Sequence, residues 1–130
     1  MFLSIVIPTL NSEKTLGICL AAIRAQSFPK DDYEIVIADA GSSDRTLEIA
    51  KEFAVDTITA NPLKTGEAGK AAGIKAAKGD IIALVDSDNI LPDPDWLKRM
   101  VEPFSDPEIL ASEPLEYTWR KEDPALTRYF

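Results

Sequence analysis

The sequence predicts an α/β fold in which a mostly parallel sheet carries helices on both faces. Short apolar runs alternate with segments whose apolar residues recur at helical spacing. Strands that alternate with helices pair in parallel, because each connection crosses over a face of the sheet. The chain has 130 residues, and 45% of them are hydrophobic. We therefore expect a single domain over residues 1–130, large enough to bury a core.

The first predicted unit is a strand followed by a helix. Residues 3–7 form an apolar run that ends at Pro8, as is typical of a fully buried strand. Asn11 and Ser12 are good helix-capping residues, and apolar side chains then recur at helical spacing until the pattern fades near Gln26. This unit is the first in the alternating order of strands and helices along the chain.

The second unit repeats this pattern. Residues 33–38 form another apolar run, and residues 39–44 make a turn that is rich in capping residues. Residues 47–53 then predict a helix, and residues 55–59 predict a short strand. The repeat of strand and helix supports a parallel sheet.

A third unit begins with an alanine-rich segment. Residues 66–78 predict a helix, and Gly79 is the expected glycine at its C-terminal cap. Residues 81–85 form the third strong apolar run, which predicts a further buried strand.

The remaining elements are weaker in the sequence. Asp93 or Asp95 is expected to cap a helix over residues 96–101. Residues 109–119 predict one further strand with a break at Pro114, and residues 124–130 predict the start of a helix.

Three of the predicted strands end in polar clusters. These clusters are Pro8-Thr9-Leu10-Asn11, Asp39-Ala40-Gly41-Ser42 and Asp86-Ser87-Asp88-Asn89. The carboxyl ends of parallel strands lie on one edge of the sheet, where such folds bind ligands. For Asn11, Ser12, Ser42 and Ser43, simple capping of the following helix is an alternative explanation.

Asp86 and Asp88 are the strongest candidates for a metal site. They flank Ser87 directly after a buried strand, and two carboxylates so close together repel each other unless a positive charge lies nearby. Magnesium typically uses one or two carboxylates together with phosphate oxygens of a substrate. The pattern therefore favours a divalent cation that bridges to a diphosphate.

Composition excludes several classes of function. The net charge is -8 and no run of basic residues occurs, so a nucleic-acid partner is not expected. The chain has no histidine and a single cysteine, Cys19, which excludes His-dependent catalytic triads and makes structural zinc untenable. No apolar run reaches the roughly 20 residues of a membrane-spanning helix. With no internal disulfide available, a cytoplasmic location is expected.

Two nucleotide-binding motifs are also missing. The turn after the first strand is Pro8-Thr9-Leu10-Asn11, which lacks the glycines of a dinucleotide site. Residues 64–71 partly match a phosphate-binding loop but lack its first glycine and its final Ser or Thr. Neither a nicotinamide cofactor nor a P-loop is expected.

The order of these motifs resembles the N-terminal, nucleotide-sugar-binding part of family 2 glycosyltransferases, which have the Rossmann-like GT-A fold. The resemblance covers residues 3 to about 105. The segments that carry it are Ser4–Asn11, Ile35–Asp44, Ala72–Asp80, Leu84–Asp88 and Pro92–Leu97. Because these motifs occur together in the family's order, the resemblance is far more specific than any one of them.

The resemblance implies a role for each candidate residue. The implied nucleotide-binding residues are Pro8, Thr9, Asn11, Asp39, Lys70, Asp86 and Ser87. Asp39 would accept a hydrogen bond from the base. Asp88, with Asp86, would hold Mg²⁺ or Mn²⁺. Lys70 stands near the place where many relatives have Arg, and a solvated surface lysine is the alternative for this residue.

The implied activity is inverting transfer of a sugar from a nucleoside-diphosphate sugar to the hydroxyl of an unknown saccharide, lipid or protein acceptor. The acceptor half of the domain is expected to be missing from this chain, and the general base is expected beyond Phe130. A non-catalytic nucleotide-binding or assembly fragment is the alternative, and a nucleotidyltransferase is a further one. Through its acceptor the protein could also lie peripherally at a membrane.

Overall fold

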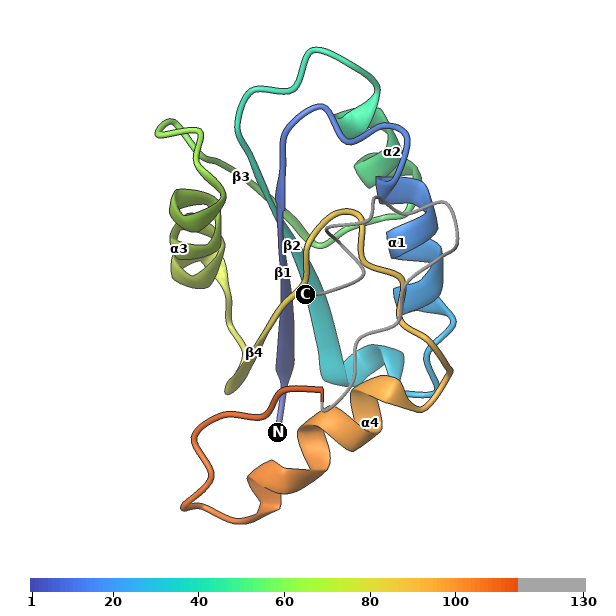
Figure 1. The fold of residues 1–130 in the computed structure, drawn as a ribbon, viewed down its shortest axis with the longest axis vertical. Coiled ribbons are helices and arrows are strands. Elements are labelled where there is room, and N and C mark those ends of the chain that lie inside the picture. The colour runs from blue at the N-terminus through green and yellow to red at the C-terminus, as the bar shows by residue number, and fades with distance from the viewer. Residues whose placement is uncertain (115–130) are drawn as a thin grey trace, which may run out of the picture.

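The structure, a computed structural model, describes residues 1–114 and contains a sheet with the strand order β3-β2-β1-β4 (Figure 1). The strands are β1 (Leu3–Thr9), β2 (Tyr33–Asp39), β3 (Thr57–Ala60) and β4 (Ile81–Leu84). The helices are α1 (Leu16–Arg24), α2 (Thr46–Glu52), α3 (Gly66–Ala76) and α4 (Trp96–Val101), with 3-10 turns η1 (Lys30–Asp32) and η2 (Glu102–Ser105). Every pair of neighbouring strands in this sheet is parallel.

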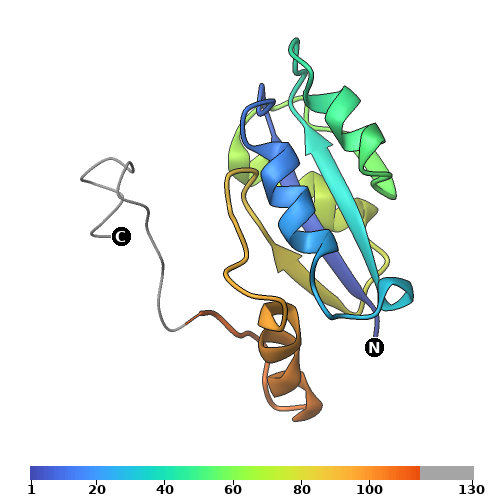
Figure 2. The same ribbon diagram turned by 90° about the vertical axis from the view of Figure 1, so that its right-hand side faces the viewer.

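Helices cover both faces of the sheet, as the sequence predicts. Helices α1 and α2 lie on one face and α3 lies on the other (Figure 1). Side chains of β1 alternate between the faces: Leu3, Ile5 and Ile7 join a buried cluster with α1, whereas Val6 faces α3. Helix α4 lies at the lower end of the ribbon (Figure 2), where Leu97 is buried in the core cluster together with side chains of α1. Within residues 1–114 no helix is long and apolar enough to cross a membrane.

Three glycines allow the chain around α3 to approach β1 closely. A Cβ at Gly69 would lie 2.8 Å from Cβ of Pro8, and a Cβ at Gly73 would overlap Cγ1 of Val6. A Cβ at Gly79 would lie 2.6 Å from the amide nitrogen of Ser4. The predicted role of Gly79 as a helix cap is wrong: α3 ends at Ala76, and Gly79 is needed for contact with the backbone of β1.

A buried polar contact fastens the same region. The Ser4 hydroxyl donates to Oε1 of Glu34 over 2.6 Å, and Oε1 also accepts from the amide of Lys78. The amide of Gly79 donates to the Ser4 hydroxyl over 2.8 Å. The polar residues of two otherwise apolar strands therefore satisfy the backbone between α3 and β4.

The expected helix caps differ from those observed. Helix α1 begins at Leu16 and receives no side-chain cap from Asn11 or Ser12. Helix α2 begins at Thr46, after Ser42 and Ser43, and its first amide is bonded instead by the carboxylate of Asp44. Asn11 and Ser42 are left to make contacts between loops, which are described below.

Two other predicted elements also differ from the structure. The short third strand covers Thr57–Ala60 in place of residues 55–59. Residues 109–114 form no strand, so the first part of the strand predicted over residues 109–119 is wrong. The rest of that prediction, and the helix predicted over residues 124–130, lie outside the described residues.

Replacing Gly73 by Ala is expected to lower the free energy of unfolding by ~1–3 kcal/mol, the usual cost of overpacking. Alanine favours a helix by up to about 1 kcal/mol over glycine, but the new methyl group would overlap Val6. Urea unfolding measures the change. Gly66→Ala is the matched control, because no atom lies near a Cβ at this position of the same helix. Stabilisation by Gly73→Ala equal to that of the control would contradict the close packing of α3 on β1.

Candidate functional site

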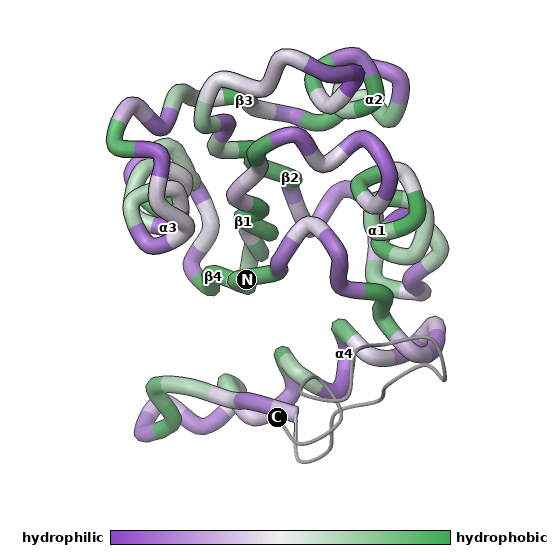
Figure 3. Tube along the Cα trace, turned by 45° about the horizontal axis from the view of Figure 1, so that its top comes forward, coloured by the Kyte–Doolittle hydropathy of each residue, from purple (hydrophilic) through white to green (hydrophobic). Residues whose placement is uncertain are grey.

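The candidate site lies at the carboxyl ends of the strands. Figure 3 shows this edge, where polar loops lie between α3 and α1. Two adjoining cavities open here, with volumes of about 800 and 210 Å³. Asp86 and Ser87 line both of them. The segment that follows β4 therefore stands between the two cavities.

The larger cavity holds most of the predicted polar residues. Its lining residues are Asn11, Ser12, Glu13, Lys14, Thr15, Asp44, Asp86, Ser87 and Asp88. The hydroxyl groups of Ser12 and Ser87 lie 3.0 Å apart, so the loop after β1 contacts the segment after β4. The structure thus brings together residues that are more than 70 positions apart in the sequence.

The smaller cavity lies between the end of β1 and the start of α3. Its lining residues are Pro8, Thr9, Leu10, Ala40, Asn61, Lys64, Thr65, Gly66, Asp86 and Ser87. Four of the predicted nucleotide-binding residues are among them. Asn61 and Lys64 were missed by the sequence reasoning, although Asn61 directly follows β3 and the strand-end rule applied to the other strands would have found it.

Asp39 lies at the end of β2 but lines neither of these two cavities. Its Oδ1 accepts hydrogen bonds from the hydroxyls of Thr9 and Ser42, over 2.7 and 2.6 Å. Its Oδ2 accepts from the amides of Gly41 and Ser42, over 3.0 and 2.8 Å. Burial opposes ionisation, but the bonds from Ser42, Thr9 and Gly41 outweigh it and lower the pKa of Asp39 below its ordinary value.

The loops after β1 and β2 are joined by reciprocal hydrogen bonds. The amide of Asn11 donates to the Ser42 hydroxyl, and the amide of Ser43 donates to Oδ1 of Asn11. Asn11 has φ of 47°, a left-handed conformation that Asn tolerates better than most residues. The side chain of Asn11 therefore shapes the wall of the larger cavity.

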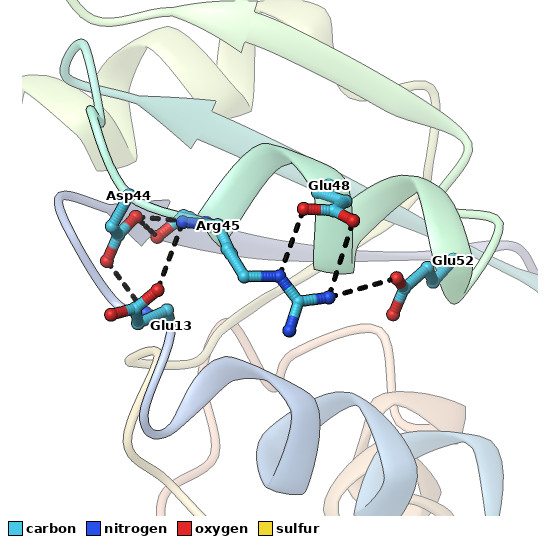
Figure 4. A network of polar contacts seen from close by, with 6 residues as sticks. Glu13, Asp44, Arg45, Glu48 and Glu52 are labelled. Atoms are coloured by element: carbon cyan, nitrogen blue, oxygen red, sulfur yellow. Dashed lines mark hydrogen bonds and ion pairs between the residues drawn. The ribbon is translucent and has the colours of Figure 1, made fainter.

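A second set of contacts fastens the same two loops further out (Figure 4). The amide of Glu13 donates to Oδ2 of Asp44, and the amide of Arg45 donates to Oε2 of Glu13. The Arg45 guanidinium also forms ion pairs with Glu48 and Glu52, at 3.0 and 3.3 Å. Because these ion pairs are exposed they stabilise the fold little, and the hydrogen bonds between the loops contribute more to their geometry.

Lys70 reaches the site from α3. Its Nζ lies 4.0 Å from Oδ1 of Asp86 and 3.4 Å from Oε1 of Glu67. The lysine is therefore at the site edge, close enough to pair with an anion bound beside Asp86. No described residue forms a hydrogen bond or an ion pair with the carboxylate of Asp88, which lines the larger cavity.

The donor atoms at Asp86 and Asp88 fit a hard divalent cation. Carboxylate and hydroxyl oxygens are the ligands that Mg²⁺ and Mn²⁺ prefer. Among residues 1–114 no three acidic, Cys or His side chains cluster closely enough to hold a metal by themselves. Where a protein supplies only one or two carboxylates, phosphate oxygens of a substrate would have to complete the coordination of the metal.

Cys19 is a buried cysteine that contacts the segment after β4. Its Sγ donates to the carbonyl oxygen of Asp86 over 3.7 Å. Burial, together with the charges of Asp88 and Asp86, raises the pKa of the thiol to about 12. The thiol stays protonated at neutral pH, so it is neither a nucleophile nor a thiolate ligand.

Comparisons with known proteins agree with this geometry. The glycosyltransferase AglE of Haloferax volcanii is 31% identical, and the match covers 98% of this chain and 44% of AglE. The structure of Staphylococcus aureus TarS 1-349 in complex with UDP-GlcNAc matches with a TM-score of 0.66 and 29% identity, over 79% of this chain and 32% of the TarS 1-349 chain.

A third relative contains a metal. The structure of glucosyl-3-phosphoglycerate synthase from Mycobacterium tuberculosis, in complex with Mn²⁺, UDP and glucosyl-3-phosphoglycerate, matches with a TM-score of 0.66 and 27% identity. The match covers 79% of this chain and 39% of the synthase. The chain thus spans less than half the length of each of these three relatives.

The fold of these relatives is the GT-A fold, of which the described residues form a part. Residues 4–117 match the sequence profile of Glycosyl transferase family 2. This match covers most of the sequence, and it includes the ends of all four described strands. The chain belongs to glycosyl transferase family 2.

Proposed function

We propose that this chain is the donor-binding part of an inverting glycosyltransferase that uses a nucleoside-diphosphate sugar and Mg²⁺ or Mn²⁺. The observation that carries the proposal is the pair of adjoining cavities that share Asp86 and Ser87. A base bound in the smaller cavity would place its diphosphate beside Asp86 and Asp88. The larger cavity would then receive the sugar.

Each predicted residue has a place in this proposal. Pro8 and Thr9 line the cavity proposed for the base, and Asn11 lines the cavity proposed for the sugar. Lys70, next to Asp86, would pair with a phosphate oxygen. Asp88 and Asp86 would hold the metal ion, which when bound supplies positive charge to the leaving diphosphate. Asp39 would accept a hydrogen bond from the base, and the hydrogen bonds that its carboxylate accepts from Thr9 and Ser42 would hold it in position.

The relatives support both the donor class and the metal. One was crystallised with UDP-GlcNAc and another with UDP and Mn²⁺. In the proposed reaction the acceptor oxygen attacks the anomeric carbon while the bond to the nucleoside diphosphate breaks. The acceptor proton passes to a general base, which we place outside the described residues.

Calorimetric titration of the 130-residue chain tests the proposal. UDP, GDP, CDP and dTDP are each added with and without Mn²⁺, and at least one is expected to bind only when the metal is present. Absence of binding in a chain shown by circular dichroism to be folded would contradict the proposal. A parallel incubation with nucleotide-sugars and an acceptor tests the alternative of a non-catalytic fragment, which turnover by the chain would exclude.

A further inference from the structure

The segment after β4 carries both carboxylates of the proposed metal site on a single turn. Asp86 is the first residue of this turn, Asp88 is the third and Asn89 is the fourth. The amide of Asn89 donates to the carbonyl oxygen of Asp86 over 2.9 Å, which is the hydrogen bond typical of a β-turn. The directions in which the two carboxylates leave the backbone therefore depend on the shape of this turn.

The turn begins where β4 leaves the sheet, and a residue of β1 explains why it leaves there. The last hydrogen bond between the two segments runs from the amide of Val85 to the carbonyl oxygen of Val6, over 3.0 Å. In this parallel ladder the next residue of β1 to donate toward β4 would be Pro8, which has no amide hydrogen. Pairing therefore stops after Val85, and the following residues are available to form a turn.

Asn89 closes the turn a second time through its side chain. Oδ1 of Asn89 accepts a hydrogen bond from the amide of Asp86 over 2.9 Å. The backbone and the side chain of Asn89 thus hold the carbonyl group and the amide of the same residue, as a reciprocal pair of hydrogen bonds. Asn89 lines neither of the two cavities, so it shapes the turn from outside the cavity walls.

Two further contacts hold the turn against its neighbours. Sγ of Cys19 donates to the carbonyl oxygen of Asp86 over 3.7 Å, and the hydroxyl of Ser87 lies 3.0 Å from that of Ser12. These contacts place the turn relative to α1 and to the loop after β1. The reciprocal pair from Asn89 lies within the turn, and so it determines the internal shape.

The internal shape matters because nothing else directs the Asp88 side chain. Among the described residues none forms a hydrogen bond or an ion pair with its carboxylate, so its direction follows from the backbone. Mg²⁺ demands near-ideal octahedral geometry, and two carboxylates one residue apart can meet one ion only if the turn between them is held. Residues that orient metal ligands typically change metal affinity by about 10- to 100-fold.

We propose that Asn89 is a positioning residue of the donor site, which holds the turn in the shape that lets Asp86 and Asp88 bind one divalent cation. This inference rests on the proposed function. It adds to that function a residue that contacts neither the nucleotide nor the metal ion.

The test compares Asn89→Ala with Asn89→Asp in the full chain. Alanine removes the acceptor for the Asp86 amide, whereas aspartate has the same shape and keeps an acceptor oxygen. Mn²⁺ is titrated into each protein at a fixed concentration of UDP, GDP, CDP or dTDP, and calorimetry gives the Mn²⁺ concentration at half saturation. Asn89→Ala is expected to raise this concentration at least tenfold, and Asn89→Asp is expected to keep it within about threefold.

Asp106→Ala is the matched control. The carboxylate of Asp106 accepts a hydrogen bond from the amide of Glu108 in another exposed turn, and Asp106 lines neither cavity. Its loss removes the same kind of bond away from the proposed metal site, so half saturation should stay within about threefold of the unmodified value. Urea unfolding verifies that every variant is folded.

Each result has a defined meaning. Unchanged half saturation in folded Asn89→Ala would overturn the inference and leave the proposed function intact. A loss in Asn89→Asp as large as that in Asn89→Ala would also overturn it, because the acceptor would then not be what the site needs. Mn²⁺ binding tenfold tighter in Asn89→Asp would show direct contact with the metal in place of a positioning role. No binding of any nucleoside diphosphate by the unmodified chain would overturn both.

Discussion

Replacing Asp88 by Asn is expected to weaken Mn²⁺-dependent binding of a nucleoside diphosphate by roughly 100-fold or more. The substitution keeps the size of the side chain and removes the charge that would hold the metal. Even residues that only support a metal ligand change affinity by about 10- to 100-fold, so loss of a ligand should reach at least the upper end. Calorimetric titration with and without Mn²⁺ measures the change.

The structure favours Asp88 over Asp86 as the more sensitive position. Asp86 already lies 4.0 Å from Nζ of Lys70, whereas the Asp88 carboxylate has no such partner among the described residues. Asp31→Asn is the matched control, since Asp31 is an exposed acid in η1 at the opposite edge of the sheet. Both variants change the net charge equally. An Asp88→Asn protein that kept the full metal dependence of the control would show that the metal is held elsewhere.

The central strands could be predicted because a run of apolar residues in the local sequence indicates a buried strand. Residues 3–7 and 33–38 are apolar apart from Ser4 and Glu34, and both form the central strands β1 and β2. Glycine positions were harder, because their cause is a contact between distant segments. Gly79 follows a helix and so predicts a cap, yet its requirement comes from Phe2 and Ser4, which approach it in the folded chain.

The candidate site, like the fold, could be predicted from the sequence only in part. The strand-end rule found the segments after β1, β2 and β4, and the structure brings the first and the last of them together across the larger cavity. Asn61 was not among the predicted residues because β3 is only four residues long, with alternating burial, and so gives a weak sequence signal. The sequence also could not show that the Asp39 carboxylate accepts hydrogen bonds from the following loop, since those bonds depend on the path of that loop.

Replacing Asp39 by Ala is expected to lower the free energy of unfolding by ~3–5 kcal/mol, a large part of the ~5–15 kcal/mol that stabilises a typical domain. The side chain is 7% exposed, and its removal leaves the amides of Gly41 and Ser42 without their acceptor. Asp39→Asn should cost only about 1 kcal/mol, because its oxygen can accept from the two amides while its NH₂ group donates to the hydroxyls of Thr9 and Ser42. Urea unfolding at pH 7 compares the two variants.

The dependence of these effects on pH separates charge from shape at Asp39. Since the folded-state pKa of Asp39 is lowered, its ionisation stabilises the fold fully above the unfolded-state pKa of about 3.9, and this contribution is lost as pH falls through the folded-state pKa. The stability difference between the unmodified protein and Asp39→Asn should therefore shrink on acidification below pH ~4, while that of Asp31→Asn serves as the reference for an exposed acid. A difference that stayed constant would mean that the loop needs the shape of the Asp39 side chain and not its charge, and the neutral amide would then serve the neighbouring donors equally well.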